Sequence, residues 1–420
     1  MEKDIVMLES SEVKNNSIET ETSVKTYPDP FNSVVWNAVY ENATDIHINK
    51  VEDGMLVLYR VDGLNHEKQH LSESEGRKLL NQIKTAAGLN AMKSFLPQEA
   101  QIKWPDDLMQ RDIRVTVVPT GRETETAHLR ILSFPQEATD ISNLGFSEQD
   151  IEVISSTVNS MGGLILISGV SGSGKTTTMY SFASLMDLRS NIAFSIEDPV
   201  EFNLPFAQQL EVDEKHNFTM YEGLQTILRM DPDLVLVGEI RDRDSAIVAA
   251  RAALSGRLVL ATIHAKDAAG TIDALHYLGV PYYVIGGSLK LIVSQNLLRK
   301  LCPSCAAERT ITDEERELFN KCELTPPERV HIATGCNKCD QYGYRGLTAI
   351  FETAKVNSDI ANLIAEGTHQ KQLRDFFRKI GIKSMLVDGL KKVMQGTTSI
   401  EELYRVCDFR FDVNKKETTD

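Results

Sequence analysis

The segment LILISGVSGSGKT, residues 164–176, decides the fold of this 420-residue chain. Residues 164–168 are apolar up to the closing Ser168, and such a run predicts a fully buried strand. The residues from Gly169 to Thr176 match the pattern G-x-x-x-x-G-K-[ST], and a helical pattern over residues 175–188 follows. A strand, a glycine-rich loop and a helix in this order predict a phosphate-binding loop.

The residue types of this loop suit a nucleotide phosphate. Gly172 and Gly174 let the backbone bend so that N–H groups point at phosphate oxygens, and the following helix presents its positive end to the same anion. Lys175 supplies a charge for the β- and γ-phosphates, and the hydroxyl of Thr176 can hold Mg²⁺. We therefore expect ATP and Mg²⁺ here. The predicted binding residues are Gly169, Ser171, Gly172, Ser173, Gly174, Lys175, Thr176 and Thr177.

Apolar strands continue beyond the loop, over residues 192–196, 234–237 and 258–262, with helical segments between them. Alternating strands and helices with continuously apolar strands predict an α/β fold, in which helices cover both faces of a parallel sheet. We assign residues 138–301 to this domain.

Polar residues follow three of these strands at their carboxyl ends, where ligands bind in α/β sheets. Glu197 follows one strand and Glu239 another, and either acid could hold Mg²⁺ or activate water for hydrolysis. His264 follows the third strand and could hydrogen-bond a γ-phosphate. The sequence leaves open which glutamate has which role.

A smaller α+β domain is expected over residues 31–137. Its pattern predicts helices over residues 31–39 and 72–87, and strands over residues 45–48, 55–59, 112–119 and 126–132. Asp53-Gly54 predicts a hairpin turn, Gly88 a helix cap, and residues 134–136 a linker. Residues 1–30 are polar and predict a disordered tail; a short docking peptide at residues 5–8 is the alternative.

Four of the six cysteines form two C-x-x-C pairs, Cys302 with Cys305 and Cys336 with Cys339. In a reducing compartment such pairs indicate metal binding rather than disulfides, and four thiolates suit a closed tetrahedral Zn²⁺ site. We expect a structural zinc module over residues 302–345 and a helical region over residues 346–420. Cys322 and Cys407 are expected to be ordinary buried thiols.

The composition fits a globular chain of two to four domains. The 45 Lys+Arg and 60 Asp+Glu give a formal net charge of -15, which argues against a general basic footprint for nucleic acid. An acidic chain could dock instead on basic loops of a partner. No run approaches the roughly 18 apolar residues of a membrane span, and the first residues do not form a secretory signal. We therefore expect a cytoplasmic protein without a transmembrane segment.

In their order along the chain, these motifs resemble the secretion ATPases of type II secretion and type IV pilus assembly, the GspE/PilB group. The resemblance covers roughly residues 43–405 and includes Asp45-Ile46-His47-Ile48 near its start. Its most specific parts are the phosphate loop, the acidic box of residues 197–201, residues 229–233 leading into Gly238-Glu239-Ile240-Arg241-Asp242, and the histidine box of residues 262–264.

The resemblance implies a RecA-like P-loop ATPase domain preceded by a small PAS-like domain. It implies a homo-hexamer that hydrolyses ATP to power assembly of a type IV pilus or a type II pseudopilus. The implied partner is a polytopic inner-membrane platform protein, which would place the motor at the cytoplasmic side of that membrane. No direct binding of nucleic acid is expected. The four-cysteine module is common in assembly motors and generally missing from pilus retraction ATPases.

The resemblance also implies roles for individual residues. Arg114 and Arg130 match intersubunit arginines that stabilise charge on the γ-phosphate. Glu239 matches a support for Mg²⁺, and Glu197 is a leading candidate for activating water. Two further arginines, Arg229 and Arg241, would contact phosphate or couple the site to a neighbouring subunit.

Three short segments depart from the family pattern: Ala265-Lys266 replaces Thr-Asn, Gln98-Glu99-Ala100-Gln101 lacks the arginine of the related turn, and Gln295-Asn296-Leu297 replaces Gln-Arg-Leu. They put contacts between subunits and the turnover rate in doubt. A nucleotide-responsive scaffold with little hydrolysis therefore stays open. A related DNA-uptake or conjugation motor also stays open, because the motifs barely separate it from a pilus or secretion motor.

Overall fold

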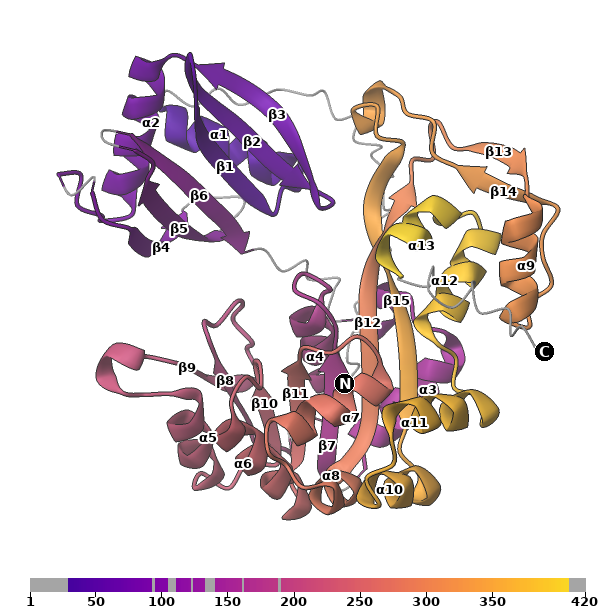
Figure 1. Cartoon of the computed structure of the whole chain (residues 1–420). Coiled ribbons are helices and arrows are strands. Elements are labelled where there is room, and N and C mark those ends of the chain that lie inside the picture. Colours follow the sequence, from indigo (N-terminus) through magenta and orange to yellow (C-terminus); the bar gives the residue numbers. More distant parts are fainter. Residues whose placement is uncertain are drawn as a thin grey trace, which may run out of the picture. The chain divides into compact units, whose positions relative to one another are not determined.

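The computed structural model describes residues 29–92, 95–104, 111–121, 124–132, 140–160, 162–187 and 190–407. The chain divides into two compact units, Met1–Ile131 and Leu132–Asp420, here called the N-terminal and C-terminal units (Figure 1). None of the described helices is long and apolar enough to cross a membrane. Residues 1–28 of the expected tail and the expected linker over residues 134–136 lie outside the described residues.

The N-terminal unit is a six-stranded sheet with strand order β3-β2-β1-β6-β5-β4 and two helices packed on one face. The strands are β1 (Asp45–Val51), β2 (Gly54–Val61), β3 (Leu64–Leu71), β4 (Gln98–Trp104), β5 (Arg111–Pro119) and β6 (Glu125–Leu132). The helices are α1 (Pro30–Tyr40) and α2 (Glu73–Ala86). Ser72 begins α2 with a capping box to Glu75, and Gly88 follows its end with φ of +64°, as a helix cap predicts.

Alternation along the strands separates the two faces of this sheet. Ile113 and Val115 are fully buried in the core under α1 and α2, whereas Arg114 between them is exposed. Successive side chains of a strand point to opposite faces, so Arg114 lies on the face away from the helices, here called the open face. The strands expected around residues 45–48, 55–59, 112–119 and 126–132 are confirmed, whereas β3 and β4 were not anticipated.

The C-terminal unit contains a seven-stranded sheet with strand order β15-β12-β7-β11-β10-β8-β9, parallel except for β15. Its strands are β7 (Gly163–Ser168), β8 (Ala193–Glu197), β9 (Ala207–Glu211), β10 (Leu234–Val237), β11 (Leu258–Ile263), β12 (Leu289–Leu301) and β15 (Tyr344–Lys355). A separate antiparallel pair is formed by β13 (Ala307–Thr310) and β14 (Arg329–Ile332).

Helices connect and cover these strands. They are α3 (Glu148–Val158), α4 (Lys175–Ala183), α5 (Met220–Leu228), α6 (Arg243–Leu254), α7 (Ala268–Tyr277), α8 (Tyr282–Ser288), α9 (Asp313–Lys321), α10 (Ser358–Ala365), α11 (Gln370–Lys379), α12 (Met385–Met394) and α13 (Ile400–Val406). Short 3₁₀ turns are η2 (Ile141–Leu144), η3 (Glu214–His216) and η4 (Asn337–Cys339).

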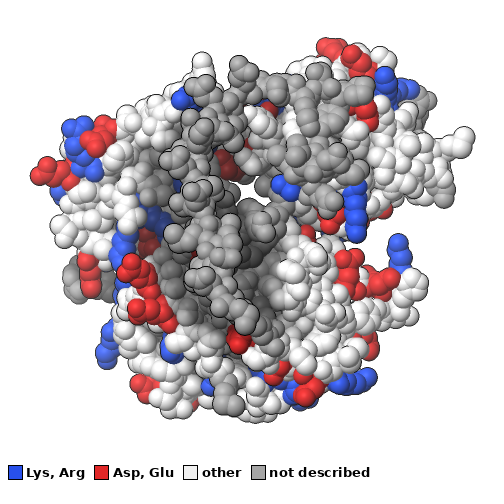
Figure 2. Space-filling view, turned by 180° about the vertical axis from the view of Figure 1, so that it is seen from behind, with Lys and Arg blue, Asp and Glu red and all other residues white. Residues whose placement is uncertain are grey.

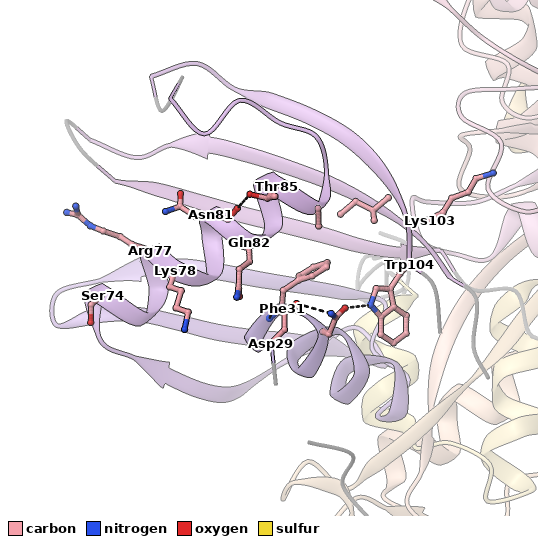
Figure 3. A pocket seen from close by; sticks show the side chains of 13 residues that line it. Asp29, Phe31, Ser74, Arg77, Lys78, Asn81, Gln82, Thr85, Lys103 and Trp104 are labelled. Carbon is pink, nitrogen blue, oxygen red and sulfur yellow. Dashed lines mark hydrogen bonds between the residues drawn. The ribbon is translucent and has the colours of Figure 1, made fainter. Parts of the chain in front are cut away.

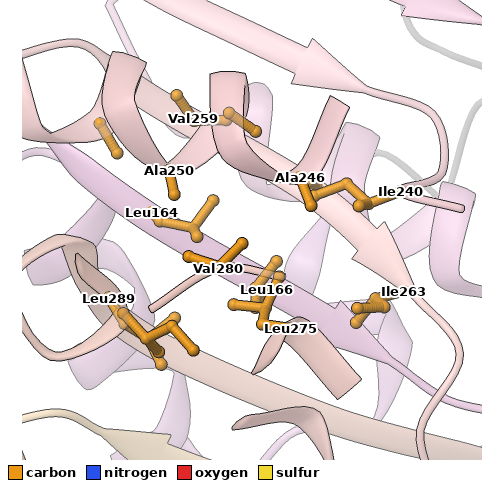
Figure 4. Close-up of a cluster of buried hydrophobic side chains, with 14 of the residues drawn as sticks. Leu164, Leu166, Ile240, Ala246, Ala250, Val259, Ile263, Leu275, Val280 and Leu289 are labelled. Carbon is orange, nitrogen blue, oxygen red and sulfur yellow. The ribbon is translucent and has the colours of Figure 1, made fainter. Parts of the chain in front are cut away.

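The central strands are buried on both faces, as their continuous apolar runs predict. On one face Leu164 and Leu166 of β7 pack with residues of α6 and α7 such as Ala250 and Leu275 (Figure 4). On the other face the alternate residue Ile165 belongs to a second core that includes side chains of α3 and α4. The expected α/β class, with helices on both faces of a mostly parallel sheet, is therefore confirmed.

Two expectations about this unit are corrected. The helix after the loop ends at Ala183 rather than near residue 188, because Leu185 and Met186 pack against the core from a turn. The region after residue 345 is not wholly helical, because β15 pairs along almost its full length with β12 before α10 begins.

On the face seen in Figure 2, acidic and basic side chains of the described residues are interspersed.

Candidate functional site

The predicted phosphate loop connects β7 to α4, as the sequence indicated. Gly172 and Gly174 have φ of +74° and +85°, a conformation that L-residues with a side chain rarely adopt. A Cβ on Gly169 would lie 2.4 Å from the carbonyl oxygen of Gln295, so no larger residue fits without movement. The glycines therefore serve both the bend of the loop and its close approach to β12.

The loop is equipped for an anion. Gly174 is the N-cap of α4 and supplies no side-chain cap, so the first N–H groups of the helix are left to other acceptors. The hydroxyl of Ser173 is buried without a hydrogen-bond partner in the described structure. Nζ of Lys175 donates to the carbonyl oxygens of Gly169 and Val170, each at 3.1 Å, and so lies against the loop. These groups fit the phosphates of a nucleotide.

Gln295 supports the loop from β12, a role that the sequence analysis missed. Its side chain is 2% exposed, and Nε2 donates to the carbonyl oxygen of Ser173 at 2.6 Å. Because one amide holds one loop carbonyl, the conformation of the loop depends on β12. The sequence signal for this was the glutamine directly after the apolar residues 291–293 and Ser294.

The ends of β10 and β11 bring two predicted residues, Glu239 and His264, beside the loop and Lys175. His264 Nδ1 lies 3.1 Å from the carbonyl oxygen of Gly169 and 3.5 Å from Lys175 Nζ. On its other side, His264 Nε2 lies 2.5 Å from Glu239 Oε1. The imidazole therefore spans the distance between the phosphate loop and the carboxylate of Glu239.

Arg241 holds the Glu239 carboxylate through one oxygen, Oε2, and the other oxygen, Oε1, accepts no hydrogen bond from the described residues. Arg241 donates to Oε2 through Nε at 3.0 Å and through Nη2 at 2.7 Å, and its Nη1 lies 3.4 Å from Asp198 Oδ2. Oε1 is buried and receives no hydrogen bond within the described residues, so its contact with His264 is an ion-pair distance without hydrogen-bond geometry. A carboxylate fixed through one oxygen is the kind of ligand that Mg²⁺ takes through the other, which His264 Nε2 contacts in this structure.

Burial and neighbouring charges shift the pKa values of the two cations of this cluster in opposite directions. Burial lowers the pKa of Lys175, while the nearby charges of Glu239 and Glu201 oppose this shift. The hydrogen bonds to Glu239 raise the pKa of Arg241 further, so this guanidinium stays protonated. The site thus combines cationic groups for phosphate with an acidic group for a metal.

Glu197 occupies a different environment, at the end of β8. It is 2% exposed and accepts hydrogen bonds from Ser195 Oγ at 2.6 Å, from Gln209 Nε2 at 3.1 Å and from the hydroxyl of Tyr180. Burial and the adjacent Glu197 carboxylate raise the pKa of Tyr180, so the phenol remains a donor. Both oxygens of Glu197 are therefore engaged in a buried cluster.

Replacing Glu197 with glutamine is expected to lower the free energy of unfolding of the C-terminal unit by about 1–3 kcal/mol, because three donors then lose a charged acceptor. Urea unfolding of the full chain, followed with and without nucleotide, measures this. The same variant is expected to keep much of any ATP hydrolysis. Unchanged stability with abolished hydrolysis would show instead that Glu197 activates water.

The three other predicted arginines are described within their own units. Arg114 on β5 and Arg130 on β6 belong to the N-terminal unit and project from its open face. Arg229 is the exposed C-cap residue of α5, and its side chain makes no hydrogen bond or ion pair with the described residues. Within the C-terminal unit, the structure therefore joins Arg241, but not Arg229, to the cluster around Glu239.

The four paired cysteines converge at one point. Their sulfur atoms all lie within 4.8 Å of one another, with Sγ–Sγ distances of 4.0 Å for Cys302–Cys336, 3.8 Å for Cys305–Cys339 and 3.7 Å for Cys336–Cys339. A tetrahedral zinc site with Zn–S bonds of about 2.3 Å has sulfur atoms about 3.8 Å apart. The cluster is therefore compatible with Zn²⁺.

The surroundings of Cys339 favour its thiolate, whereas burial and the neighbouring Cys339 raise the pKa of Cys305 to about 11. Burial opposes ionisation of Cys339, but backbone N–H groups of Cys336 and Gly343, each 3.2 Å from its sulfur, lower the pKa of this thiol to about 7. Cys322 and Cys407 lie outside the cluster, and burial raises the pKa of both thiols. Both residues are half-buried rather than fully buried, and their role as ordinary thiols stays a prediction.

A cleft of about 960 Å³ lies in the N-terminal unit, between the start of α1, α2 and the end of β4 (Figure 3). Asn32 links its walls, since Oδ1 accepts from Trp104 Nε1 at 2.8 Å and Nδ2 donates to Asp29 Oδ2 at 2.8 Å. The cleft is on the helix side of the sheet, opposite to Arg114 and Arg130. No predicted site residue lines it.

Comparison with known proteins places the chain in a family. The family described as "Type II/IV secretion system protein" matches residues 21–405. The type II secretion system protein E of Pseudomonas aeruginosa is 35% identical over 375 residues, which are 89% of this chain and 74% of that protein. The type IV pilus assembly ATPase PilB of Myxococcus xanthus is 33% identical over 379 residues, which are 89% of this chain and 66% of that protein.

A solved structure supports the same assignment at the level of the fold. The X-ray structure of the ATPase DotB of Legionella pneumophila has a TM-score of 0.67 and 20% identity, covering 92% of this chain and 97% of that one. At this identity the similarity concerns the fold alone. With the match over most of its length and relatives above 30% identity, the chain belongs to the GspE/PilB group of the type II/IV secretion system ATPase family.

Proposed function

We propose that this chain is a cytoplasmic ATPase motor that powers assembly of a type IV pilus or a type II secretion pseudopilus at the inner membrane. The observation that carries the proposal is the convergence of Lys175, His264 and Glu239 on a phosphate loop in a chain of this family. The names of the two relatives, a type II secretion protein and a pilus assembly ATPase, supply the two candidate machines.

The geometry suggests how the work is divided at the nucleotide. The loop from Gly169 to Thr177 would cradle the phosphates, with Lys175 neutralising charge on the β- and γ-phosphates. Glu239 Oε1 and the Thr176 hydroxyl would hold Mg²⁺, which, when bound, neutralises phosphate charge during hydrolysis. His264, between the loop and Glu239, would respond to the presence of the γ-phosphate.

We further propose a homo-hexamer that docks on a polytopic platform protein. Arg114 and Arg130 would supply guanidinium groups to the γ-phosphate, and Arg229 would contact phosphate or a neighbouring subunit. Residues 31–137 would be the small domain, residues 138–301 the ATPase domain, and residues 302–345 a module held by Zn²⁺, followed by the C-terminal region of residues 346–420.

The direct test is phosphate release from MgATP by the purified full chain, compared with Glu239→Gln. We expect Mg²⁺-dependent hydrolysis that falls by about 100-fold in the variant, because the amide cannot replace a carboxylate ligand of the metal. Equal low rates in both proteins, with intact ATP binding, would favour the scaffold alternative. Stimulation by DNA would point to the DNA-transport alternative.

A further inference from the structure

The open face of the N-terminal sheet holds Arg130 by one end only. Asp45 of β1 and Arg130 of β6 are direct cross-strand partners, and these strands are neighbours in Figure 1. Arg130 Nε donates to Asp45 Oδ1 at 3.0 Å, and the side chain makes no other hydrogen bond within the described residues. The Arg130 side chain is 57% exposed, whereas that of Asp45 is 7% exposed. The carboxylate thus fixes the base of the guanidinium and leaves both Nη groups for another ligand.

Asp45 is itself immobilised as an anion. Thr44 Oγ1 donates to its Oδ2 at 2.9 Å, and His128 Nε2 lies 2.9 Å from Oδ1. The ring of His128 stacks on His47 with centroids 4.7 Å apart. Burial opposes the charge, but the hydrogen bonds from His128, Thr44 and Arg130 hold the pKa of Asp45 well below its usual range.

Arg114 on the same face provides an internal comparison. Its Nε also donates to a carboxylate, Glu99 Oε1 at 2.7 Å, but both side chains are about half exposed, at 44% and 51%. An exposed pair of flexible side chains restrains its members weakly. The two arginines therefore have the same chemistry at Nε and differ in how firmly they are held.

We propose that Asp45 is a positioning residue for Arg130, which presents its two Nη groups to a phosphate anion. A guanidinium that is already oriented loses less side-chain entropy when it meets its ligand, so more of the interaction stabilises the transition state. The proposal rests on the proposed function in one respect, that Arg130 acts on the γ-phosphate.

A double-mutant cycle on the full chain tests this. With MgATP we expect Arg130→Ala to lower kcat by about 100-fold or more, as for an arginine that stabilises transferring phosphate. Asp45→Asn is expected to lower kcat by about 10-fold, the lower end for groups that orient a site residue. In the Arg130→Ala background, Asp45→Asn is expected to change kcat by less than about twofold, since the two effects share one pathway. Glu99→Gln is expected to lower kcat by less than about fivefold.

The outcomes distinguish the role of Arg130 in hydrolysis from its positioning by Asp45. A 10-fold effect of Asp45→Asn that persists in the Arg130→Ala background would show that Asp45 acts on the fold and would overturn the proposal. A wild-type kcat for Arg130→Ala would refute the role of Arg130 in the proposed function. Positioning of Arg130 by Asp45 would then have no effect on hydrolysis. Arg130→Lys covers the case of an unstable Asp45 variant: it keeps the charge but has no Nε, and a wild-type kcat would contradict positioning by Asp45.

Discussion

Replacing Lys175 with alanine is expected to lower kcat/KM for MgATP by about 100- to 1000-fold, the range for removing one preorganised group that stabilises transition-state charge. Its Nζ lies against the loop carbonyls of Gly169 and Val170 and 3.5 Å from His264 Nδ1. Arg241, the cation that acts on Lys175 from the same cluster, cannot take its place, because Glu239 holds it. Steady-state phosphate release over a range of MgATP concentrations measures the effect.

Lys215→Ala is the matched control, because Lys215 is an exposed lysine in η3 of the same unit. Its kinetics are expected to equal those of the wild type. Thermal unfolding of Lys175→Ala should also resemble the wild type, since the ammonium group makes its contacts at the loop surface. An active wild type whose Lys175→Ala variant keeps the same kcat/KM would contradict the assignment of this loop as the phosphate site.

The phosphate loop was predictable because all its requirements are local. The buried strand, the two glycines with positive φ and the helix start lie within one continuous segment. His264 and Glu239 were also predictable as candidates, since His264 directly follows an apolar strand of a parallel sheet and Glu239 follows another after Gly238. The carboxyl ends of the strands of such a sheet lie at one edge. Residues that follow these strands in the sequence are therefore predicted to lie close together.

The different surroundings of Glu197 and Glu239 were not predictable from their motifs. Both acids follow apolar strands, but the partners of Glu197 come from α4, β8 and β9. The hydrogen bond between Arg130 and Asp45 was not predictable either, because Asp45 is 85 positions away in the chain. Hydrogen bonds between distant segments leave no periodic signal, so sequence reasoning could name these residues without placing them.

The missed strands have physical reasons as well. β3 carries polar residues on both faces, as an edge strand of the N-terminal sheet, so its sequence LNHEKQHL shows no apolar alternation. β15 pairs with β12 from its first residues, but its first five residues are half-buried or exposed, and its buried run begins only at Ala349. In both cases tertiary pairing determines the strand, and local propensity does not.

Replacing Cys302 with serine is expected to abolish zinc binding and to unfold the segment around residues 302–345. Structural zinc contributes about 10–16 kcal/mol in small zinc-binding domains, comparable to the whole stability of a typical domain of about 5–15 kcal/mol. This segment has some support of its own, since Phe319 and Val330 pack in a small core with α12 and α13. We therefore expect local rather than global unfolding. Metal analysis and hydrogen exchange of the full chain measure the two effects.

Cys322→Ser is the matched control, because Cys322 lies in the same segment but outside the sulfur cluster. It is expected to keep one zinc per chain and wild-type hydrogen exchange over residues 302–345. Removing zinc from the wild type with a chelator should reproduce the effect of Cys302→Ser, and added Zn²⁺ should reverse the effect of the chelator. The reason is that the metal, and not the thiol alone, holds the two C-x-x-C pairs together. A Cys302→Ser protein that retains stoichiometric zinc, or a wild type whose segment exchanges equally with and without zinc, would contradict a structural role. Either result would leave the small core of α9 and β14 as the main support of this module.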